Sequence, residues 1–185
     1  MDERVSSALT ALARRPADVR TSLIVLAGYV AVMTIVVVVG QMVFRRRRRA
    51  YDAYCLDRGF QLEPRRPGEE ARHVTTCPLF AKGRARDWGF TIVGVANGSP
   101  FIAFEYEWIT GPARLWTDHT IAGILWTLQR DDMPPFFDPV LHVAGAGREL
   151  MWWRDGKLPS PKAFDDFLAE GYRVRLRYEP PTCGQ

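Results

Sequence analysis

The most constraining feature of this sequence is a long apolar segment. Residues 21–44 contain no Asp, Glu, Lys, Arg or His, and five consecutive arginines, Arg45, Arg46, Arg47, Arg48 and Arg49, follow directly. An α-helix rises about 1.5 Å per residue, so this segment would extend roughly 36 Å, more than the hydrocarbon core of about 30 Å. Helices of globular proteins rarely stay apolar on all faces for so long. The sequence therefore predicts a membrane-spanning helix over residues 21–44.

A cleaved signal peptide is the competing interpretation of this segment. Signal peptides have an apolar core of about 7 to 15 residues, followed by small residues at the cleavage site. Here the apolar segment is longer, and Gln41, Met42, Val43 and Phe44 lead directly into the arginines. The pattern therefore favours a permanent anchor.

The positive charges that flank the span predict its orientation. Residues 1–20 carry four arginines diluted by three acidic residues, whereas residues 45–64 carry six arginines, five of them at the membrane edge. Positive residues near a span favour the cytoplasmic side, so we expect the N-terminus outside and residues 45–185 in the cytoplasm. We interpret the five arginines as a topology signal, with binding of acidic lipids as the alternative.

The rest of the chain has a different composition from the anchor. The whole chain has a net charge of +4, but residues 50–185 hold 16 Lys and Arg against 18 Asp and Glu. This balance argues against a nucleic-acid-binding domain. The three cysteines form no Cys-x-x-Cys pair and no zinc-ligand spacing, which is typical of a reducing compartment. We predict no metal and no cofactor.

The hydrophobic patterns predict an α+β domain with an antiparallel β-rich sheet and one short C-terminal helix. The clearest signal is a hairpin, in which Asn97-Gly98 separates two segments rich in β-forming residues. Residues 120–129 follow this hairpin. The alternation there places apolar residues on both faces, which predicts a central strand. Ser160-Pro161 predicts a helix start and Gly171 its end. The expected strands cover residues 60–63, 88–96, 101–109, 120–129, 150–153 and 172–178, and residues 136–143 form a packing loop or edge strand.

These elements define the expected domain organisation. It comprises a tail over residues 1–20, the span over 21–44, a basic helical neck over 45–58, the α+β domain over 59–178 and a loose tail over 179–185. Within the domain, residues 64–70 form a turn-rich connector. Short turns between neighbouring strands favour a meander.

Three segments of this pattern resemble a group of uncharacterised bacterial single-span membrane proteins. The segments are GFTIVGVANGSPFIAFEYEWITG, TIAGILWTLQRDDMPPF and ELMWWRDGKLPSPKAFDDFLAEGYRV. The resemblance covers roughly residues 45–178, and its shared motifs are structural. It implies a cytoplasmic α+β domain behind a single span, and it implies no activity.

Candidate chemistry is sparse. Glu105 and Glu107 share one face of a predicted strand, where they form either a solvated surface or an acid–base pair. Arg173, Arg175 and Arg177 share one face of the predicted last strand, and we expect cross-strand pairing with the two glutamates or solvation, with a binding face as the alternative. Asp118 and His119 are adjacent, so in a strand they point to opposite sides.

Two functional classes follow, together with an assembly alternative. The first is a non-catalytic interaction module at the cytoplasmic face, which binds another membrane or cytoplasmic protein or a second copy of itself. The second is a membrane-surface enzyme in which Glu105, Glu107, His119 or Asp131 converge only in the fold. The third is assembly within the bilayer through Gly28, Thr34 and Gly40, although these residues form no strict Gly-x-x-x-Gly motif.

Overall fold

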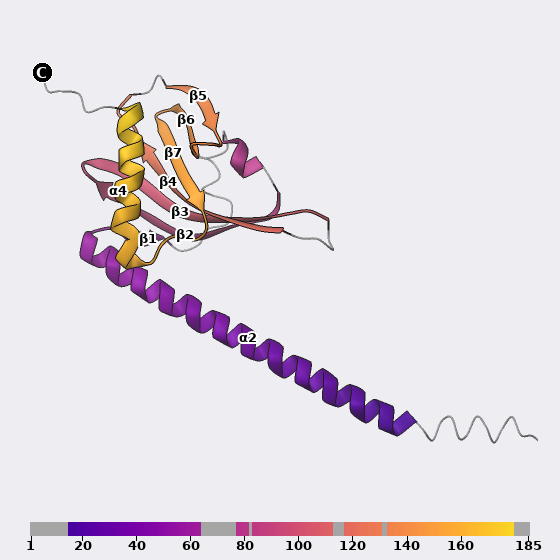
Figure 1. Ribbon diagram of the computed structural model, residues 1–185. Coiled ribbons are helices and arrows are strands. Elements are labelled where there is room, and N and C mark those ends of the chain that lie inside the picture. The colour runs from indigo at the N-terminus through magenta and orange to yellow at the C-terminus, as the bar shows by residue number, and fades with distance from the viewer. Residues whose placement is uncertain (1–14, 64–76, 82, 113–116, 131–132, 180–185) are drawn as a thin grey trace, which may run out of the picture. The chain divides into compact units, whose positions relative to one another are not determined.

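The computed structural model describes residues 15–63, 77–81, 83–112, 117–130 and 133–179 (Figure 1). It confirms the predicted α+β class, with a long N-terminal apolar helix, an antiparallel sheet and a short C-terminal helix. The elements are α2 (Arg15–Arg58), β1 (Gln61–Glu63), η1 (Pro78–Ala81), β2 (Arg84–Ala96), β3 (Ser99–Thr110), β4 (Thr117–Thr127), β5 (Met133–Asp138), β6 (Val143–Gly147), β7 (Glu149–Asp155) and α4 (Pro161–Tyr178).

Several sequence predictions fall outside the described residues. They concern the tail up to residue 14, the connector at residues 64–70, the turn at Asp131 and the tail beyond residue 179. Residues 15–20, which were assigned to the tail, belong to α2.

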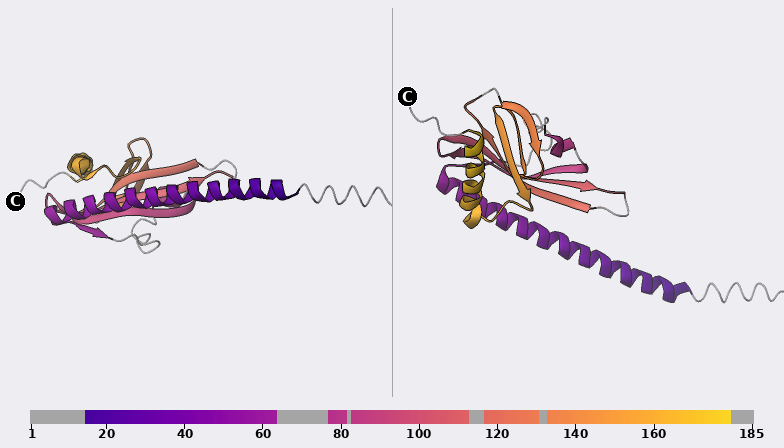
Figure 2. Two further views of the ribbon diagram at one scale, coloured as in Figure 1. Left: turned by 90° about the horizontal axis from the view of Figure 1, so that it is seen from below. Right: turned by 45° about the horizontal axis from the view of Figure 1, so that its top comes forward.

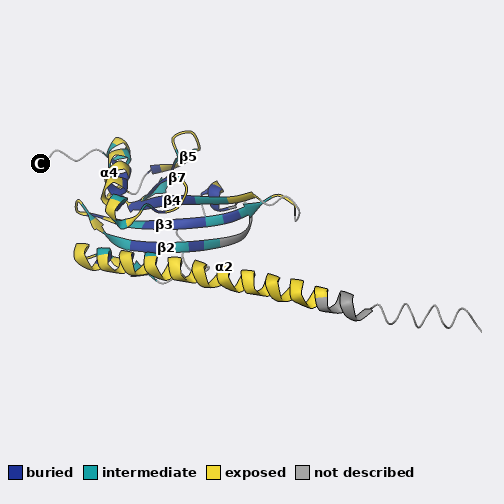
Figure 3. Ribbon diagram, turned by 60° about the horizontal axis from the view of Figure 1, so that its bottom comes forward, coloured by how far each residue is buried: buried dark blue, intermediate teal, exposed yellow. Residues whose placement is uncertain are grey.

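The chain divides into two compact units, Met1–Arg46 and Arg47–Gln185. In the first unit, every residue from 21 to 44 is exposed, as Figure 3 shows in yellow. The hydroxyl group of Thr34 donates to the carbonyl of Val30 at 2.8 Å, so it is satisfied within the helix, as a span in lipid requires. The helix is therefore long and apolar enough to cross a membrane.

The second unit begins at Arg47, whereas the sequence placed the domain from residue 59. The reason is that Tyr51 and Cys55 are buried in the main core, so the predicted neck is a structural part of the domain. Helix α2 ends where predicted, because Gly59 adopts a left-handed φ of 67° and the Phe60 N–H donates to the Cys55 carbonyl at 2.8 Å.

All seven strands in the described part of the chain form one antiparallel sheet in the order β1-β2-β3-β4-β7-β6-β5. The predicted hairpin joins β2 to β3, and Asn97 (φ 51°) and Gly98 (φ 74°) both adopt the left-handed conformation of a tight two-residue turn. The meander is confirmed for β1 to β4. The chain then crosses to the far edge and returns through β5 and β6 to β7, which pairs with β4.

Strand β4 is central, as its two-sided apolar pattern predicted. Ala122, Ile124 and Trp126 face the core under α4, whereas Ile121 and Leu125 face a second, aromatic core. Figure 2 shows α4 lying against one side of the sheet, whereas η1 contributes Leu79 and Phe80 to the aromatic core. The sheet therefore has two dissimilar buried faces.

The predicted last strand is wrong, because residues 172–178 continue helix α4. The alternation of apolar and Arg residues suggested a strand, but Phe164, Phe167, Leu168, Gly171 and Arg175 are buried at helical spacing.

Gly171 does not end the helix. A Cβ there would lie 2.7 Å from Ile124 Cδ1 and 3.1 Å from Trp152 Cε3. The glycine therefore allows α4 to approach the sheet closely, and packing overrides its weak helix propensity.

Candidate functional site

The best-defined polar site is an ion pair between the half-buried Arg47 of helix α2 and the buried Glu105 of strand β3. Glu105 is 3% exposed. Its Oε2 accepts from Arg47 Nη2 at 2.6 Å, and its Oε1 accepts from Arg47 Nη1 at 3.2 Å. This two-pronged geometry is the strongest form of a carboxylate–arginine contact.

The same site also holds the loop between β7 and α4. The Leu158 N–H donates to Glu105 Oε2 at 2.9 Å, and Arg47 Nη2 donates to the Leu158 carbonyl at 2.9 Å. The Tyr51 hydroxyl group, one turn after Arg47, donates to the Pro159 carbonyl. Three segments far apart in the sequence thus meet at one carboxylate. We call Arg47, Tyr51, Glu105 and Leu158 the helix–sheet clamp.

The surroundings of the clamp explain its electrostatics. Burial alone would lower the pKa of Arg47, but the hydrogen bonds and charge of Glu105 outweigh it and raise that pKa. The guanidinium group also lies 4.9 Å from the ring centroid of Phe90 and 5.7 Å from that of Tyr51. Burial raises the pKa of the Tyr51 hydroxyl group to about 12, so it remains a hydrogen-bond donor at neutral pH.

An irregularity in β2 makes room for the clamp. Trp88 pairs with Tyr106 and Thr91 with Phe104, so β2 holds one residue more than β3 over this stretch. A Cβ at Gly89 would lie 2.9 Å from both Cβ and Oε1 of Glu105. The glycine therefore provides the space that the carboxylate occupies.

The prediction for Glu105 and Glu107 is right about their shared face and wrong about its exposure. Glu105 is buried, because the end of α2 covers this part of the sheet. Glu107 is half-buried, and its Oε1 lies 3.4 Å from Lys157 Nζ. Neither glutamate forms a described ion pair with Arg173, Arg175 or Arg177.

The predicted arginine face does not exist. On a helix, residues two apart point in nearly opposite directions. Arg175 is buried, lies over the Tyr172 ring and pairs with Glu179 at 2.5 Å, whereas Arg173 and Arg177 are exposed one turn apart. The three side chains therefore form no common binding surface.

The arginine cluster after the span is not uniform. Arg45, Arg46, Arg48 and Arg49 are exposed, whereas Arg47 is half-buried in the clamp. Sequence reasoning treated the five alike. The signal that it missed is the spacing of Arg47, Tyr51 and Cys55, which lie on one helical face and precede a glycine stop.

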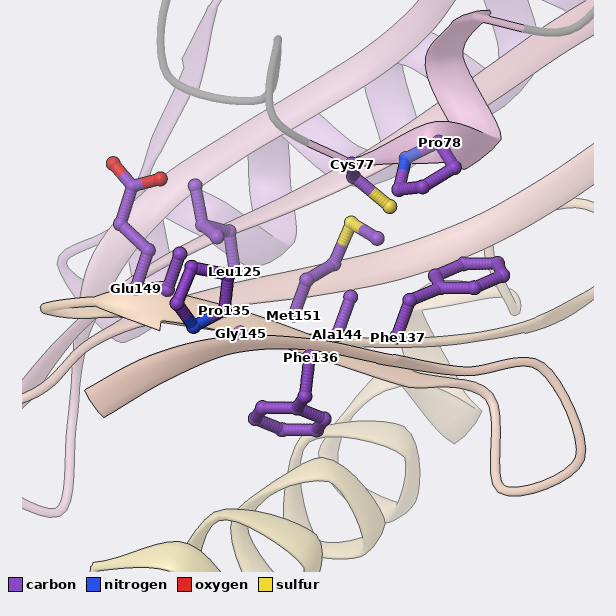
Figure 4. A pocket seen from close by; sticks show the side chains of 11 residues that line it. Cys77, Pro78, Leu125, Pro135, Phe136, Phe137, Ala144, Gly145, Glu149 and Met151 are labelled. Atoms are coloured by element: carbon purple, nitrogen blue, oxygen red, sulfur yellow. The ribbon is translucent and has the colours of Figure 1, made fainter.

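An apolar cavity of about 240 Å³ lies beside β5 and β6 (Figure 4). Cys77 and Met151 point toward each other across it, and Glu149 lies toward its other end. Phe136 points to the opposite side of β5, where its ring stacks on Tyr178. The cavity is smaller than typical ligand pockets of about 300–1,000 Å³.

A second hollow, of about 450 Å³, lies at the ends of β3 and β4 and is lined by both Glu107 and His119. These were two of the residues expected to converge in an enzyme. However, Glu107 pairs with Thr120 and Trp108 with His119, so the two side chains extend from opposite faces of the sheet. Glu105 lies apart in the clamp, so no acid–base pair is assembled from the predicted residues in the described part of the chain.

No group of three or more His, Cys, Asp or Glu side chains among the described residues is placed to hold a metal ion. No family model, curated protein or solved structure matches this chain. The resemblance to uncharacterised single-span membrane proteins therefore remains a prediction.

Proposed function

We propose that this protein is a membrane-anchored, non-catalytic interaction module that works at the cytoplasmic face of a membrane. The helix–sheet clamp is the observation that carries the proposal. The helix that contains the apolar span continues to Arg58, and its last turns lie in the core of the folded unit. A fold built on the end of its own anchor suits a protein that acts only while membrane-bound.

The proposed orientation has the N-terminus outside and the folded unit in the cytoplasm. Four arginines after the span remain exposed and can act as the positive cytoplasmic flank. A reporter that is active only in the cytoplasm, fused after Gln185, should be active. A silent fusion there, together with an active fusion at the N-terminus, would show that the orientation is the reverse of the proposed one.

The loop between β5 and β6 is the proposed contact with a protein partner. Val140 is 87% exposed and Leu141 is 53% exposed, although both are apolar. The Asp138 carboxylate accepts hydrogen bonds from both of their backbone N–H groups at 2.9 Å, which fixes the loop. A fixed apolar tip loses little conformational entropy on binding.

The edges of the sheet favour this loop over strand addition. Strand β5 carries the exposed prolines Pro134 and Pro135, which disfavour pairing with another strand. The opposite edge strand, β1, has only 3 residues.

Affinity purification of the full-length, detergent-solubilised chain tests this function. We expect a protein partner, or a second copy of the chain, to be recovered with the wild type and lost with Val140→Ser/Leu141→Ser. Leu56→Ser is the matched control, because Leu56 is 85% exposed on α2. Equal loss with the control would exclude the loop as the contact, and a chain recovered alone as a monomer would contradict the proposal.

The alternative function is a membrane-surface enzyme. The hollow lined by both Glu107 and His119 is the observation that favours it. The opposite orientation of these two side chains argues against it. Glu107→Gln and His119→Gln variants that lose function while still binding the partner would favour the enzyme.

A further inference from the structure

The aromatic face of the sheet contains a cavity that the proposed function does not use. Its volume is about 380 Å³, within the range of small-molecule sites. Strands β3, β4 and β7 and the loop between β5 and β6 contribute to it. Its lining includes Trp108, Asp118, His119, His142, Trp153 and Asp155.

Two imidazole rings line this cavity, and each stacks on a buried indole ring. His119 lies 5.0 Å from the Trp108 ring at 13°, and His142 lies 5.7 Å from the Trp153 ring at 7°. Both indoles are at least nine-tenths buried, whereas both imidazoles are half-buried. One side of each imidazole is thus stacked on its indole, and both histidines are among the residues that line the cavity.

Both histidines are held in place by the fold. His119 Nε2 lies 2.8 Å from the Thr110 hydroxyl oxygen, which fixes the ring. His142 has a left-handed φ of 54°, and its carbonyl accepts from the Trp153 N–H at 3.0 Å. The left-handed conformation is unfavourable for a non-glycine residue. The structure thus retains an unfavourable backbone that stacks His142 on Trp153.

The charge of the cavity selects a cation. Its described lining includes two acidic residues, Asp118 and Asp155, and no Lys or Arg. Asp155 pairs with Ile121 and so lies on the aromatic face, whereas Asp118 pairs with Ile109 and extends from the other face. The described His and acidic side chains are not grouped to bind a metal ion. An organic cation spreads its charge over several carbon atoms and is attracted to ring faces, without the close ligand geometry of a metal.

We propose that this cavity binds a quaternary ammonium group, with the imidazole rings of His119 and His142 beside it and Asp155 supplying the opposite charge. His142 lies in the same loop as Val140 and Leu141, but the proposal does not rest on partner binding, because the cation is placed against His142 and not against those two exposed side chains. The ammonium group can belong to a soluble molecule or to a lipid headgroup, since both present the same chemistry.

The test compares choline with its neutral isostere 3,3-dimethylbutan-1-ol, on the full-length chain in maltoside micelles. Binding is followed through the ¹H–¹³C resonances of labelled histidine rings. We expect saturable shifts of the His119 and His142 rings with choline, and binding about tenfold weaker with the neutral isostere, which corresponds to about 1.4 kcal/mol. Equal affinity for both probes, or no saturable shift with choline, would overturn the proposal.

Two variants test the site itself. Asp155→Asn should weaken choline binding several-fold while leaving the neutral isostere unchanged, whereas Asp166→Asn, exposed on α4, should change neither. His142→Asn removes one ring face and suits the left-handed backbone, so it should weaken choline binding without unfolding the domain. Equal weakening by Asp155→Asn and Asp166→Asn would show a nonspecific charge effect and contradict the site.

Nanodiscs distinguish the two sources of the cation. Histidine shifts in phosphatidylcholine discs that are absent in phosphatidylglycerol discs, with no probe added, would identify a lipid headgroup. Shifts that require added choline in both types of disc would identify a soluble ligand.

Discussion

The two halves of helix α2 are continuous in backbone and opposite in chemistry. Residues 21–44 are apolar on every side and exposed throughout. The half that starts at Arg47 has one face built from Arg47, Tyr51 and Cys55, which is buried in the folded unit, and an opposite face that includes the highly exposed Leu56. The first half is thus exposed on all sides, whereas the second half has one buried face and one exposed face.

This difference shows how strictly the environment of each half restricts the side chains that the helix can carry there. Lipid is the same on all sides of a span, so many apolar residues are interchangeable there. A protein core is packed to the density of an organic crystal, so each buried position accepts few side chains. We therefore expect substitutions in the first half to affect membrane insertion, and those in the second half to affect folding.

The largest expected effect comes from breaking the clamp. Arg47→Leu leaves the buried Glu105 carboxylate without its counter-charge, so the free energy of unfolding should fall by about 3–5 kcal/mol. Arg46→Leu, at the neighbouring exposed position, should change it by less than about 0.5 kcal/mol. Urea unfolding in micelles, followed by tryptophan fluorescence, measures both. Similar losses in the free energy of unfolding for the two variants would mean that the contact of Arg47 with Glu105 does not set the contribution of this arginine.

A double variant sharpens the same experiment. Arg47→Leu combined with Glu105→Leu removes both charges and should recover most of the lost stability. A double variant as unstable as Arg47→Leu alone would assign the loss to packing of the arginine side chain.

The corresponding test in the first half is Val37→Asp. A carboxylate at the centre of a span raises the free energy of insertion by about 2.5–3.5 kcal/mol, so the membrane-integrated fraction should fall. Val37→Leu should insert like the wild type. Insertion is measured by glycosylation of an acceptor site at the N-terminus. A normal inserted fraction with a destabilised folded unit would mean that the segment packs against protein.

The buried thiol in the second half predicts a pH dependence of a smaller size. Burial, and then the charge of Asp52, raise the pKa of Cys55 from 9.0 to about 11. The unfolded chain therefore loses this proton first, and folding stability falls as pH rises from 9.0 toward 11. The thiol should contribute a loss of about 1 kcal/mol near pH 10.

Cys55→Ala isolates this contribution. The variant is expected to be less stable at neutral pH but to lose less stability between about pH 8 and 10. Tyr51, with a pKa raised to about 12, adds a loss only above pH 10 in both proteins. Identical pH slopes for the wild type and the variant would contradict the assignment.

The smallest effect is expected at the exposed end of the same helix. Asp165 on α4 forms an ion pair with Arg58 and accepts from the Tyr54 hydroxyl group at 2.6 Å, but both charged side chains are about half exposed. Solvent screens such pairs, so Asp165→Asn should cost only about 0.2–1 kcal/mol. Asp166→Asn is the neighbouring control. A loss as large as that of Arg47→Leu would show that burial does not set the value of these pairs.

Much of the fold could be predicted because its signals are local. The Asn97-Gly98 turn, the two-sided apolar pattern of β4 and the Ser160-Pro161 helix start each depend on a few neighbouring residues. The prediction of a strand over residues 172–178 was also based on a local pattern, and it is wrong. Its local alternation was outweighed by the docking of α4 on the sheet through Gly171.

The candidate sites could not be predicted, because they join distant segments. Glu105 meets Arg47 and Leu158 only after the sheet forms against the end of α2. His119 and His142 line one cavity because β7 returns to pair with β4. Sequence patterns describe which face a residue occupies, and they do not state what covers that face.

By itself, the sequence determined that one helix of this protein is suited to lipid and that an antiparallel domain follows it. Both properties depend on the transfer free energy and spacing of side chains along the chain, which can be read without coordinates. Only the tertiary structure decided that Arg47 is half-buried in the clamp while its neighbours are exposed, and that Glu105 is buried. A charge can be buried only where a partner and hydrogen-bond donors converge on it, and that convergence is a property of packed segments.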